Sequence, residues 1–456
     1  MATYKTPGVY LEEIAKFPPS IAEVETAIPA FIGYTKQQGL SGNQIEPVKI
    51  GSTTYNVEVA RISSMLEYET LFGSTLAGVK VTFETDGRIT PDFITAAPIN
   101  TMYYHLQLYF ANGGGPCYIV SVGTPAVSIV KDALSAGLTA ISRYDEPTLL
   151  LFPEAVNLAA SADAYALYND ALAQCELLKD RFVIMDCHGK TNDVVGEFRS
   201  GISTSNLKYG AAYYPYLNTS LNYLYDESAV TIAGVPGSTT LSALKSADNN
   251  KYIQAKQALT RLHATLNPGP AIAGVYASVD DARGVWKAPA NVSLAYVTGP
   301  AVQLSDEDQE GLNVDTTAGK SINAIRTFAG KGTLVWGART LAGNDNEWRY
   351  VPVRRFFNMV EESTKKAVEA FVFEPNDANT WTKIQGMIEN YLVTLWRAGA
   401  LQGAKPEHAF YVSVGLGKTM TALDILEGRL YVEIGMAVVR PAEFIVLRFS
   451  HMMAQS

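Results

Sequence analysis

The chain has 456 residues, of which 47% are hydrophobic and 18% are charged. This composition is typical of a folded protein and excludes a disordered chain, and the length predicts two or three domains. The formal net charge of −9 argues against nucleic acid as a partner, because phosphate binding requires clustered lysine and arginine. The three cysteines form no CxxC pair, which argues against a disulfide framework or a zinc ribbon.

Residues 1–20 are predicted to form an N-terminal arm. Breakers stand at Pro7 and Gly8, and the segment that follows has strand-like composition. Its residues are Val9, Tyr10, Leu11 and Glu12. A short strand at a chain end cannot satisfy its own backbone hydrogen bonds, so we expect it to pair with another strand.

Residues 21–300 alternate between segments of strand and helix composition, which predicts an outer α/β layer domain. It carries two insertions, a β-containing one over 36–95 and a second over 190–250. Strands are expected at 27–34, 117–122, 147–152, 182–185 and 271–276. Helices are expected at 63–72, 100–110, 159–178 and 253–265, and residues 228–250 are expected to be a loop or part of the second insertion.

Residues 301–440 are predicted to form an inner C-terminal α+β domain, followed by a C-terminal arm at 441–456. One helix begins at Pro352, and the next is capped by Asn379 or Thr380 and carries an apolar stripe. Strands are expected at 409–414 and 429–434 and, in the arm, at 443–449. The fold class is therefore α/β (α+β) with several domains and two extended strand arms.

Three patterns could indicate catalysis, and each has a structural explanation. The GLGKT run at 415–419 lacks the first glycine of a phosphate-binding loop, because Val412 stands in its place. The glycines at 113–115 follow a helix, where a helix stop is expected. Asp186, Cys187 and His188 are neighbours on a predicted strand, so they point to alternate faces. We expect no catalytic residue, cofactor or metal site, and we interpret the protein as a non-enzyme.

Tryptophan and arginine residues recur from residue 286 onward. We interpret them as a core with guanidinium–aromatic stacking, which is compatible with a role in assembly. They are Trp286, Trp336, Trp348, Arg339, Arg354 and Arg355. The acidic run from Asp306 to Asp315 is expected to be a solvated face.

Nine motifs, in order along the chain, resemble those of contractile tail sheath proteins. They are TPGVYLEEI (6–14), AIPAFIGY (27–34), FANGGGPCYIVSV (110–122), DDARGVWKAPAN (280–291), INAIRTFAGKGTLVWGARTL (322–341), VRRFFNMVEES (353–363), FVFEPND (371–377), LWRAGALQG (395–403) and VEIGMAVVRPAEFIVLRF (432–449). Ser121 departs from the family pattern, which has arginine there. The opening is most similar to sheath subunits of extracellular contractile injection systems.

The resemblance implies a structural subunit that polymerises helically around an inner tube and contracts to drive the tube through a target envelope. The implied partners are further copies of the chain, the inner tube protein, baseplate and terminal cap proteins and, in some particles, sister sheath proteins. Nucleic acid and direct membrane insertion are not expected. Assembly is expected in the bacterial cytoplasm, within a phage tail or a released injection particle. The alternatives are a baseplate-proximal or cap-proximal relative of the sheath and, in another class, an α/β enzyme or binding module.

Both arms are expected to add strands to a sheet of neighbouring subunits, formed around 409–414 and 429–434. In the C-terminal arm the candidate residues are Phe444, Val446 and Arg448. For the inner tube, the candidate contact is the region 361–370 with Lys365 and Lys366.

Overall fold

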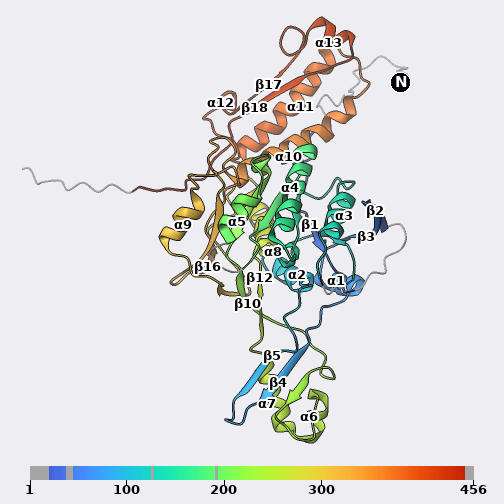
Figure 1. The fold of residues 1–456 in the computed structure, drawn as a ribbon. Coiled ribbons are helices and arrows are strands. Elements are labelled where there is room, and N and C mark those ends of the chain that lie inside the picture. Colours follow the sequence, from blue (N-terminus) through green and yellow to red (C-terminus); the bar gives the residue numbers. More distant parts are fainter. Residues whose placement is uncertain (1–19, 37–44, 125–127, 190–193, 447–456) are drawn as a thin grey trace, which may run out of the picture. The chain divides into compact units, whose positions relative to one another are not determined.

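The computed structural model describes residues 20–36, 45–124, 128–189 and 194–446 (Figure 1). The chain divides into two compact units. The larger unit contains residues 25–361 and the segment that begins at Arg440, and the smaller unit contains residues 362–439 and the segment that ends at Val24. Residues 301–361, which we expected in the inner domain, thus lie in the larger unit.

A ten-stranded sheet forms the centre of the larger unit, and its middle strands are parallel. In spatial order the strands are β13 (Val292–Ser293), β16 (Gly332–Val335), β15 (Ile322–Phe328), β9 (Gly210–Tyr214), β8 (Phe182–Asp186), β7 (Leu149–Leu151), β1 (Pro29–Gly33), β6 (Cys117–Ser121), β3 (Thr53–Ile62) and β2 (Ile45–Ile50). The outer strands β2, β3, β13 and β16 pair antiparallel. The five strands from β9 to β6 are buried on both faces, which explains why they read as uninterrupted apolar runs.

Helices cover both faces of this sheet and create two hydrophobic cores. The neighbours Phe31 and Ile32 on β1 point into different cores, as the alternation of a strand requires. One core includes α2 (Met102–Ala111) and α8 (Gly269–Arg283). The other core includes α3 (Lys131–Ile141), α4 (Ser161–Leu178) and α5 (Val194–Gly201), with short 3-10 turns at Ala155–Asn157 and Leu207–Tyr209.

A small lobe is built from two stretches that are distant in sequence. Its sheet has the order β11 (Thr231–Ala233), β4 (Val79–Phe83), β5 (Ile89–Phe93), with α6 (Leu241–Ala247) and α7 (Asn249–Leu259) packed on it. The Tyr104 hydroxyl binds the backbone of both stretches, at Thr75 O and Leu224 N. The larger unit also contains α1 (Met65–Phe72), α9 (Asp306–Asn313) and a three-stranded sheet of β12 (His263–Leu266), β10 (Leu217–Asn222) and β14 (Val297–Pro300).

Three local predictions in this unit are wrong. Residues 271–276 belong to helix α8 and not to a strand, because a short apolar run buried on every side has no periodicity that separates the two. The helix predicted over 253–265 ends at Leu259, and β12 follows. Residues 228–250 are not a loop but contain β11 and α6, whose apolar residues are buried in the lobe.

The smaller unit contains the end of α10 (Val351–Val368), the helix α11 (Ala378–Arg397) and a two-stranded sheet. Helix α10 enters it from the larger unit, and α11 packs against strand β17. Asp377, and not Asn379 or Thr380 as predicted, is the N-cap of α11, and its side chain accepts the backbone N–H groups of both. The remaining elements are a 3-10 turn (Glu369–Phe371), α12 (Pro406–Ala409), β17 (Phe410–Val414), α13 (Ala422–Leu426) and β18 (Val432–Met436).

Candidate assembly site

A buried arginine holds the last described segment of the chain. The Nε of Arg339 donates to Oε1 of Glu443 at 2.8 Å and to Oε2 at 3.1 Å, and Nη2 also binds Oε2. The Arg339 side chain is 5% exposed and the Glu443 side chain is 22% exposed. Several N–H groups of one planar guanidinium therefore grip one carboxylate, which is among the stronger and more directional polar contacts in proteins. We call Arg339 and Glu443 the arm anchor.

The arginine of the arm anchor is itself fixed on both sides. Its Nη1 donates to Asn313 O at 3.0 Å, at the end of α9. Its backbone N–H donates to Oδ1 of Asn323 at 2.7 Å, and its carbonyl accepts from Nδ2 of the same residue at 2.8 Å. Asn323 lies on the central sheet, so the guanidinium is held in place by the core of the larger unit.

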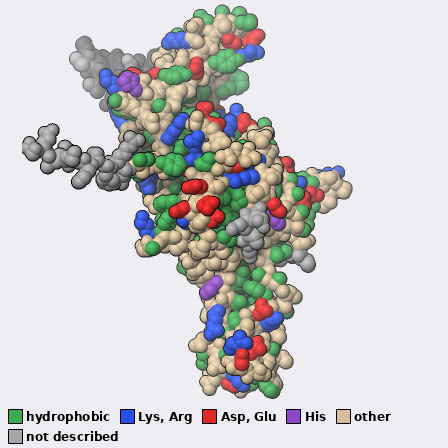
Figure 2. Space-filling view, turned by 60° about the vertical axis from the view of Figure 1, so that its left-hand side comes forward, with side chains coloured by type: hydrophobic (Ala, Val, Ile, Leu, Met, Phe, Trp, Pro, Cys, Tyr) green, Lys and Arg blue, Asp and Glu red, His purple; other side chains and the backbone are tan. Residues whose placement is uncertain are grey.

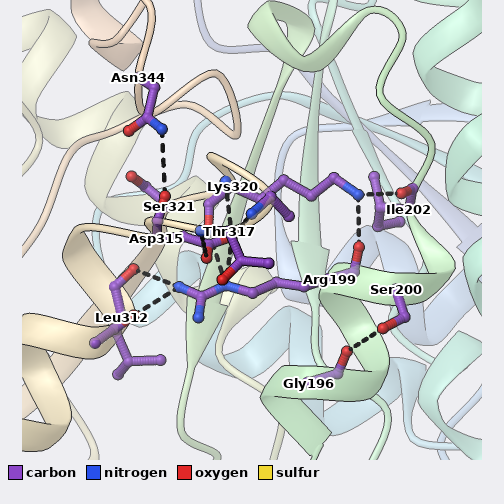
Figure 3. Close-up of polar contacts among 12 residues, drawn as sticks. Gly196, Arg199, Ser200, Ile202, Leu312, Asp315, Thr317, Lys320, Ser321 and Asn344 are labelled. Carbon is purple, nitrogen blue, oxygen red and sulfur yellow. Dashed lines mark hydrogen bonds and ion pairs between the residues drawn. The ribbon is translucent and has the colours of Figure 1, made fainter.

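The C-terminal end of α9 is a junction of several hydrogen bonds (Figure 3). Arg199 on α5 donates to Gly311 O at 2.7 Å and to Leu312 O at 3.1 Å, and the Ser321 hydroxyl donates to Asn313 O at 2.6 Å. The last carbonyls of a helix have no partner within the helix and form its negative pole, so an arginine there is favourable. Arg199 of α5 and Ser321, which precedes β15, thus bind the same end of α9 that Arg339 of the arm anchor contacts.

Asp315 and Lys320 complete this network (Figure 3). Asp315 accepts the backbone N–H groups of Thr317, Ala318 and Lys320 and lies 3.4 Å from Arg199. Burial raises the pKa of the Asp315 carboxyl, but these N–H groups and the guanidinium outweigh burial and hold the pKa below its usual value. The ammonium of Lys320 donates to Arg199 O and to Ile202 O, beside the end of α5, and burial lowers its pKa. The loop before β15, residues 314–321, is therefore fixed by hydrogen bonds within itself and by hydrogen bonds to the end of α5.

Three large apolar side chains follow the arm anchor and are uncovered. Phe444, Ile445 and Val446 are 72%, 79% and 75% exposed. Single exposed apolar residues are common on protein surfaces, whereas consecutive ones usually mark a contact surface.

Strands β17 and β18 form an antiparallel two-stranded sheet in the smaller unit, which we call the open sheet. The hydrogen bond from Ala437 N to Ala409 O shows that these two residues form a hydrogen-bonded pair. Hydrogen-bonded and non-hydrogen-bonded pairs alternate along an antiparallel ladder. It follows that the N–H and C=O groups of Val412 and Ile434 point away from the pair, toward the two outer edges. Within the described residues, no further strand pairs with either edge.

The two strands of the open sheet differ in how well their inward side chains are covered. Val412 and Val414 on β17 are buried, whereas Ile434 and Met436 on β18 are only half-buried. On the outer face, the Tyr411 ring lies over Gly435, where an added Cβ would come within 2.1 Å of the ring. A two-stranded sheet alone is marginally stable, and the partly exposed apolar side chains of β18 are the ones that a further strand would cover.

Lys365 and Lys366 lie near the end of α10, and both form ion pairs with one carboxylate. The Lys365 ammonium is 3.1 Å from Glu362 and that of Lys366 is 3.6 Å away. Glu362 is buried, whereas both lysines are substantially exposed. The adjacent Glu361 pairs with Arg354 at 2.9 Å. The exposed ends of both lysines therefore lie beside a buried carboxylate of the same helix.

The carboxyl edge of the parallel strands is filled by a buried polar network. Glu154 accepts the N–H groups of Tyr34 at 2.7 Å and Thr101 at 2.8 Å. Burial raises its pKa to about 8, although these N–H groups lower it. Asp186 accepts from Asn267 and Gly269 N, and burial raises its pKa to about 7. Doubly wound folds bind ligands at this edge, and here the polar groups are buried against one another.

Among the residues that the sequence singled out, His188 binds Leu158 O at 2.7 Å and Cys187 is buried in a hydrophobic core. The glycines of the 415–419 run have positive φ and lie in a turn. Within the described ranges, no three acidic, histidine or cysteine side chains lie close enough together to bind a metal ion. None of the described helices is both long and apolar enough to span a membrane.

The predicted arm residues are only partly described. Val9, Tyr10, Leu11, Glu12 and Arg448 lie outside the described residues. Phe444 and Val446 are described, exposed and in no regular secondary structure, and their pairing with another copy stays a prediction. The pairing of Arg339 with Glu443 could not be predicted from the sequence, because the partners are 104 residues apart and no local pattern connects them.

The predicted guanidinium–aromatic stacking is confirmed for one pair of the set, because Arg354 lies 4.5 Å from the ring centre of Trp348. Arg355 lies 4.5 Å from the ring centre of Tyr276, which was not in the predicted set, and Trp286 and Trp336 pack against Phe356 and Phe328.

In the acidic run, Asp306, Glu307, Asp308 and Glu310 are exposed as expected, and Figure 2 shows acidic side chains on one face of the molecule. The expectation is wrong for Asp315, which is buried because its carboxylate accepts backbone N–H groups of the following loop.

Comparisons with known proteins extend over the whole chain. Residues 343–451 match the family model of the phage tail sheath C-terminal domain. A tail sheath protein of Vibrio phage KVP40 is 27% identical over 130 residues, and this match spans 28% of the chain and 19% of that protein.

Two solved structures match from end to end. The chain is 30% identical to the contracted sheath complex of an extracellular contractile injection system, PVC, with a TM-score of 0.66 and coverage of 99% of this chain and 98% of that one. It is 33% identical to the contracted helical sheath of the anti-feeding prophage, with a TM-score of 0.66 and coverage of 98% and 99%. At this identity and coverage, the chain belongs to the contractile tail sheath family.

Proposed function

We propose that the protein is a sheath subunit that polymerises helically around an inner tube and contracts to drive that tube through a target envelope. The end-to-end likeness to two contracted sheaths supports this function. A further relative, 32% identical, is part of an anti-feeding prophage baseplate, which supports association with a baseplate. Inner tube and cap proteins, and in some particles sister sheath proteins, are the remaining proposed partners.

The particle is proposed to assemble in the bacterial cytoplasm and to act as part of a phage tail or as a released injection particle. The energy of contraction is stored in the extended lattice during assembly, so no nucleotide is consumed. Contraction then requires two packings of one subunit, between which the compact units move as rigid bodies.

The open sheet is the observation that carries the proposed mechanism of assembly. Among the residues that the structure describes, no third strand pairs with either of its edges, and each copy of the chain has two terminal segments of strand-like composition to donate. Strand addition satisfies backbone groups at an exposed edge, and each hydrogen bond contributes about 0.5–1.5 kcal/mol net. Repeated through a lattice, these bonds keep subunits connected while they rotate.

Two alternative functions remain distinguishable by experiment. A baseplate-proximal or cap-proximal subunit would form rings but no long tubes. An α/β enzyme or binding module would require an accessible polar pocket at the carboxyl edge of the sheet, where Glu154 and Asp186 are fully buried. We therefore propose a structural role without catalysis.

Deletion of residues 1–14 tests the assembly mechanism. We expect a folded monomer with unchanged thermal unfolding, which forms no tubes in electron micrographs under conditions in which the parent protein does. Deletion of part of the exposed loop at 84–88, which lies outside both arms, is the matched control. Normal tubes from the arm deletion would refute the mechanism.

A further inference from the structure

We infer that Glu443 is the positioning residue that fixes where the C-terminal segment leaves the larger unit, and that it thereby presents Phe444, Ile445 and Val446 to a second copy of the chain. The anchoring follows from contacts within one unit. The presentation to a second copy rests on the proposed sheath function.

The hydrogen bonds of the segment 440–446 come from a single side chain. Among the described residues 440–446, every hydrogen bond is formed by the Glu443 carboxylate: those with Arg339 and a weaker one from the Tyr350 hydroxyl at 3.4 Å. Arg440 and Ala442 before it are exposed, as are the three apolar residues after it. One side chain therefore determines where this segment lies on the unit.

The Arg339 guanidinium is a buried charge, and its burial has a cost in free energy. Removing an arginine from water is unfavourable, and a buried ion pair is weak evidence for stability, because an apolar pair of similar size often serves as well. What a bidentate pair supplies is direction, since the planar guanidinium accepts a carboxylate in few orientations. Arg339 is held by Asn313 and Asn323, so the direction of the carboxylate is set by the core.

The anchor also affects the register in which the C-terminal segment can pair with an acceptor sheet. Side chains of a strand alternate between faces, so a slip of one residue moves every apolar side chain to the wrong face of the acceptor sheet. A fixed starting point at Glu443 thus limits which pairings a neighbouring sheet can form.

A distance measurement on the monomer tests the anchor without any need for assembly. The three native cysteines are buried, so spin labels react selectively with cysteines introduced by Asn346→Cys and Val446→Cys. We expect a narrow distance distribution between the labels in the parent background. Glu443→Ala and the size-matched Glu443→Gln should broaden it, whereas the control Glu84→Ala, at an exposed glutamate of the lobe, should not. An unchanged narrow distribution in both Glu443 variants would overturn the inference.

Assembly of unlabelled protein tests the presentation to a second copy. We expect Glu443→Ala to reduce the sedimentable sheath at least tenfold with unchanged thermal unfolding of the monomer. Arg339→Lys keeps the charge but loses the planar guanidinium that binds the carboxylate with several N–H groups. It should give an intermediate yield of sheath and a distance distribution of intermediate width. A broadened distribution with full sheath yield would leave the anchor standing and refute the presentation. If the parent itself forms no sheath, the proposed function fails and the distance measurement still decides the anchor.

Discussion

Arg355 on α10 and Asp280 on α8 form an ion pair that is almost completely withdrawn from solvent, with side chains 3% and 7% exposed. Arg355 Nη1 donates to Oδ1 of Asp280 at 3.0 Å, and the Thr26 hydroxyl donates to Oδ2 at 2.6 Å. The guanidinium also lies against the ring of Tyr276. This pair connects two helices and the chain before β1 within the larger unit.

Loss of one partner of this pair should destabilise the larger unit strongly. Asp280→Asn keeps the shape of the side chain but leaves Arg355 buried without an anion, which costs about 3–5 kcal/mol in comparable pairs. We expect a clear fall in the unfolding temperature measured by calorimetry. The control is Asp86→Asn, which breaks the exposed pair with Arg88 and should change nothing measurable. Equal effects of the two substitutions would contradict the assignment.

The buried Glu154 should make the larger unit less stable as the pH rises. Its pKa is about 8 in the folded state and near 4.5 in the unfolded chain. Below pH 4.5 the group is protonated in both states; above it the unfolded chain releases a proton that the folded state retains, so unfolding becomes more favourable up to about pH 8. A pKa difference of one corresponds to about 1.4 kcal/mol, so the total effect is a few kcal/mol. Asp186, with a pKa of about 7, acts in the same direction.

Denaturant unfolding at pH 6 and pH 9 measures this dependence. Glu154→Gln should reduce the difference between the two pH values, whereas Glu84→Gln, at an exposed position, should leave it unchanged. A parent protein that is more stable at pH 9 than at pH 6 would show that Glu154 is ionised in the folded state.

Proline on the open edge of β18 should block assembly without unfolding the open sheet. Ile434 directs its N–H outward, so Ile434→Pro removes a donor for an added strand but no hydrogen bond within the β17–β18 pair. Ile434→Ala loses the same side chain and keeps the donor, and it serves as the control. We expect tubes from the alanine variant and none from the proline variant in electron micrographs. Tubes from both would exclude β18 as the accepting edge.

Charge reversal at Lys365 and Lys366 should weaken the proposed contact with the inner tube. Because both lysines pair with the buried Glu362, the double change to glutamate also adds local repulsion, so circular dichroism must first confirm that the helix is intact. We expect less co-sedimentation with tube protein, with a smaller difference at high salt. Lys383→Glu, an exposed lysine on α11, is the control. Unchanged co-sedimentation would remove both lysines from the interface.

Elements whose signals are local could be predicted from the sequence. The helix predicted at 63–72 is found as α1, with Ser64 at its N-cap and Gly73 at its C-cap, because capping depends on residues within one turn. The buried parallel strands were found because an apolar run of strand length is itself the signal. The same kind of run at 271–276 misled the prediction, since a helix buried on all sides also lacks a polar face.

The sequence by itself determined the family and the α/β class, because long motifs and apolar periodicity are written in consecutive residues. The tertiary structure alone decided the partners of the charged residues: Glu443 for Arg339, and one shared Glu362 for two lysines. An ion pair across 104 residues depends on how the whole sheet brings distant segments together, and no local propensity records it.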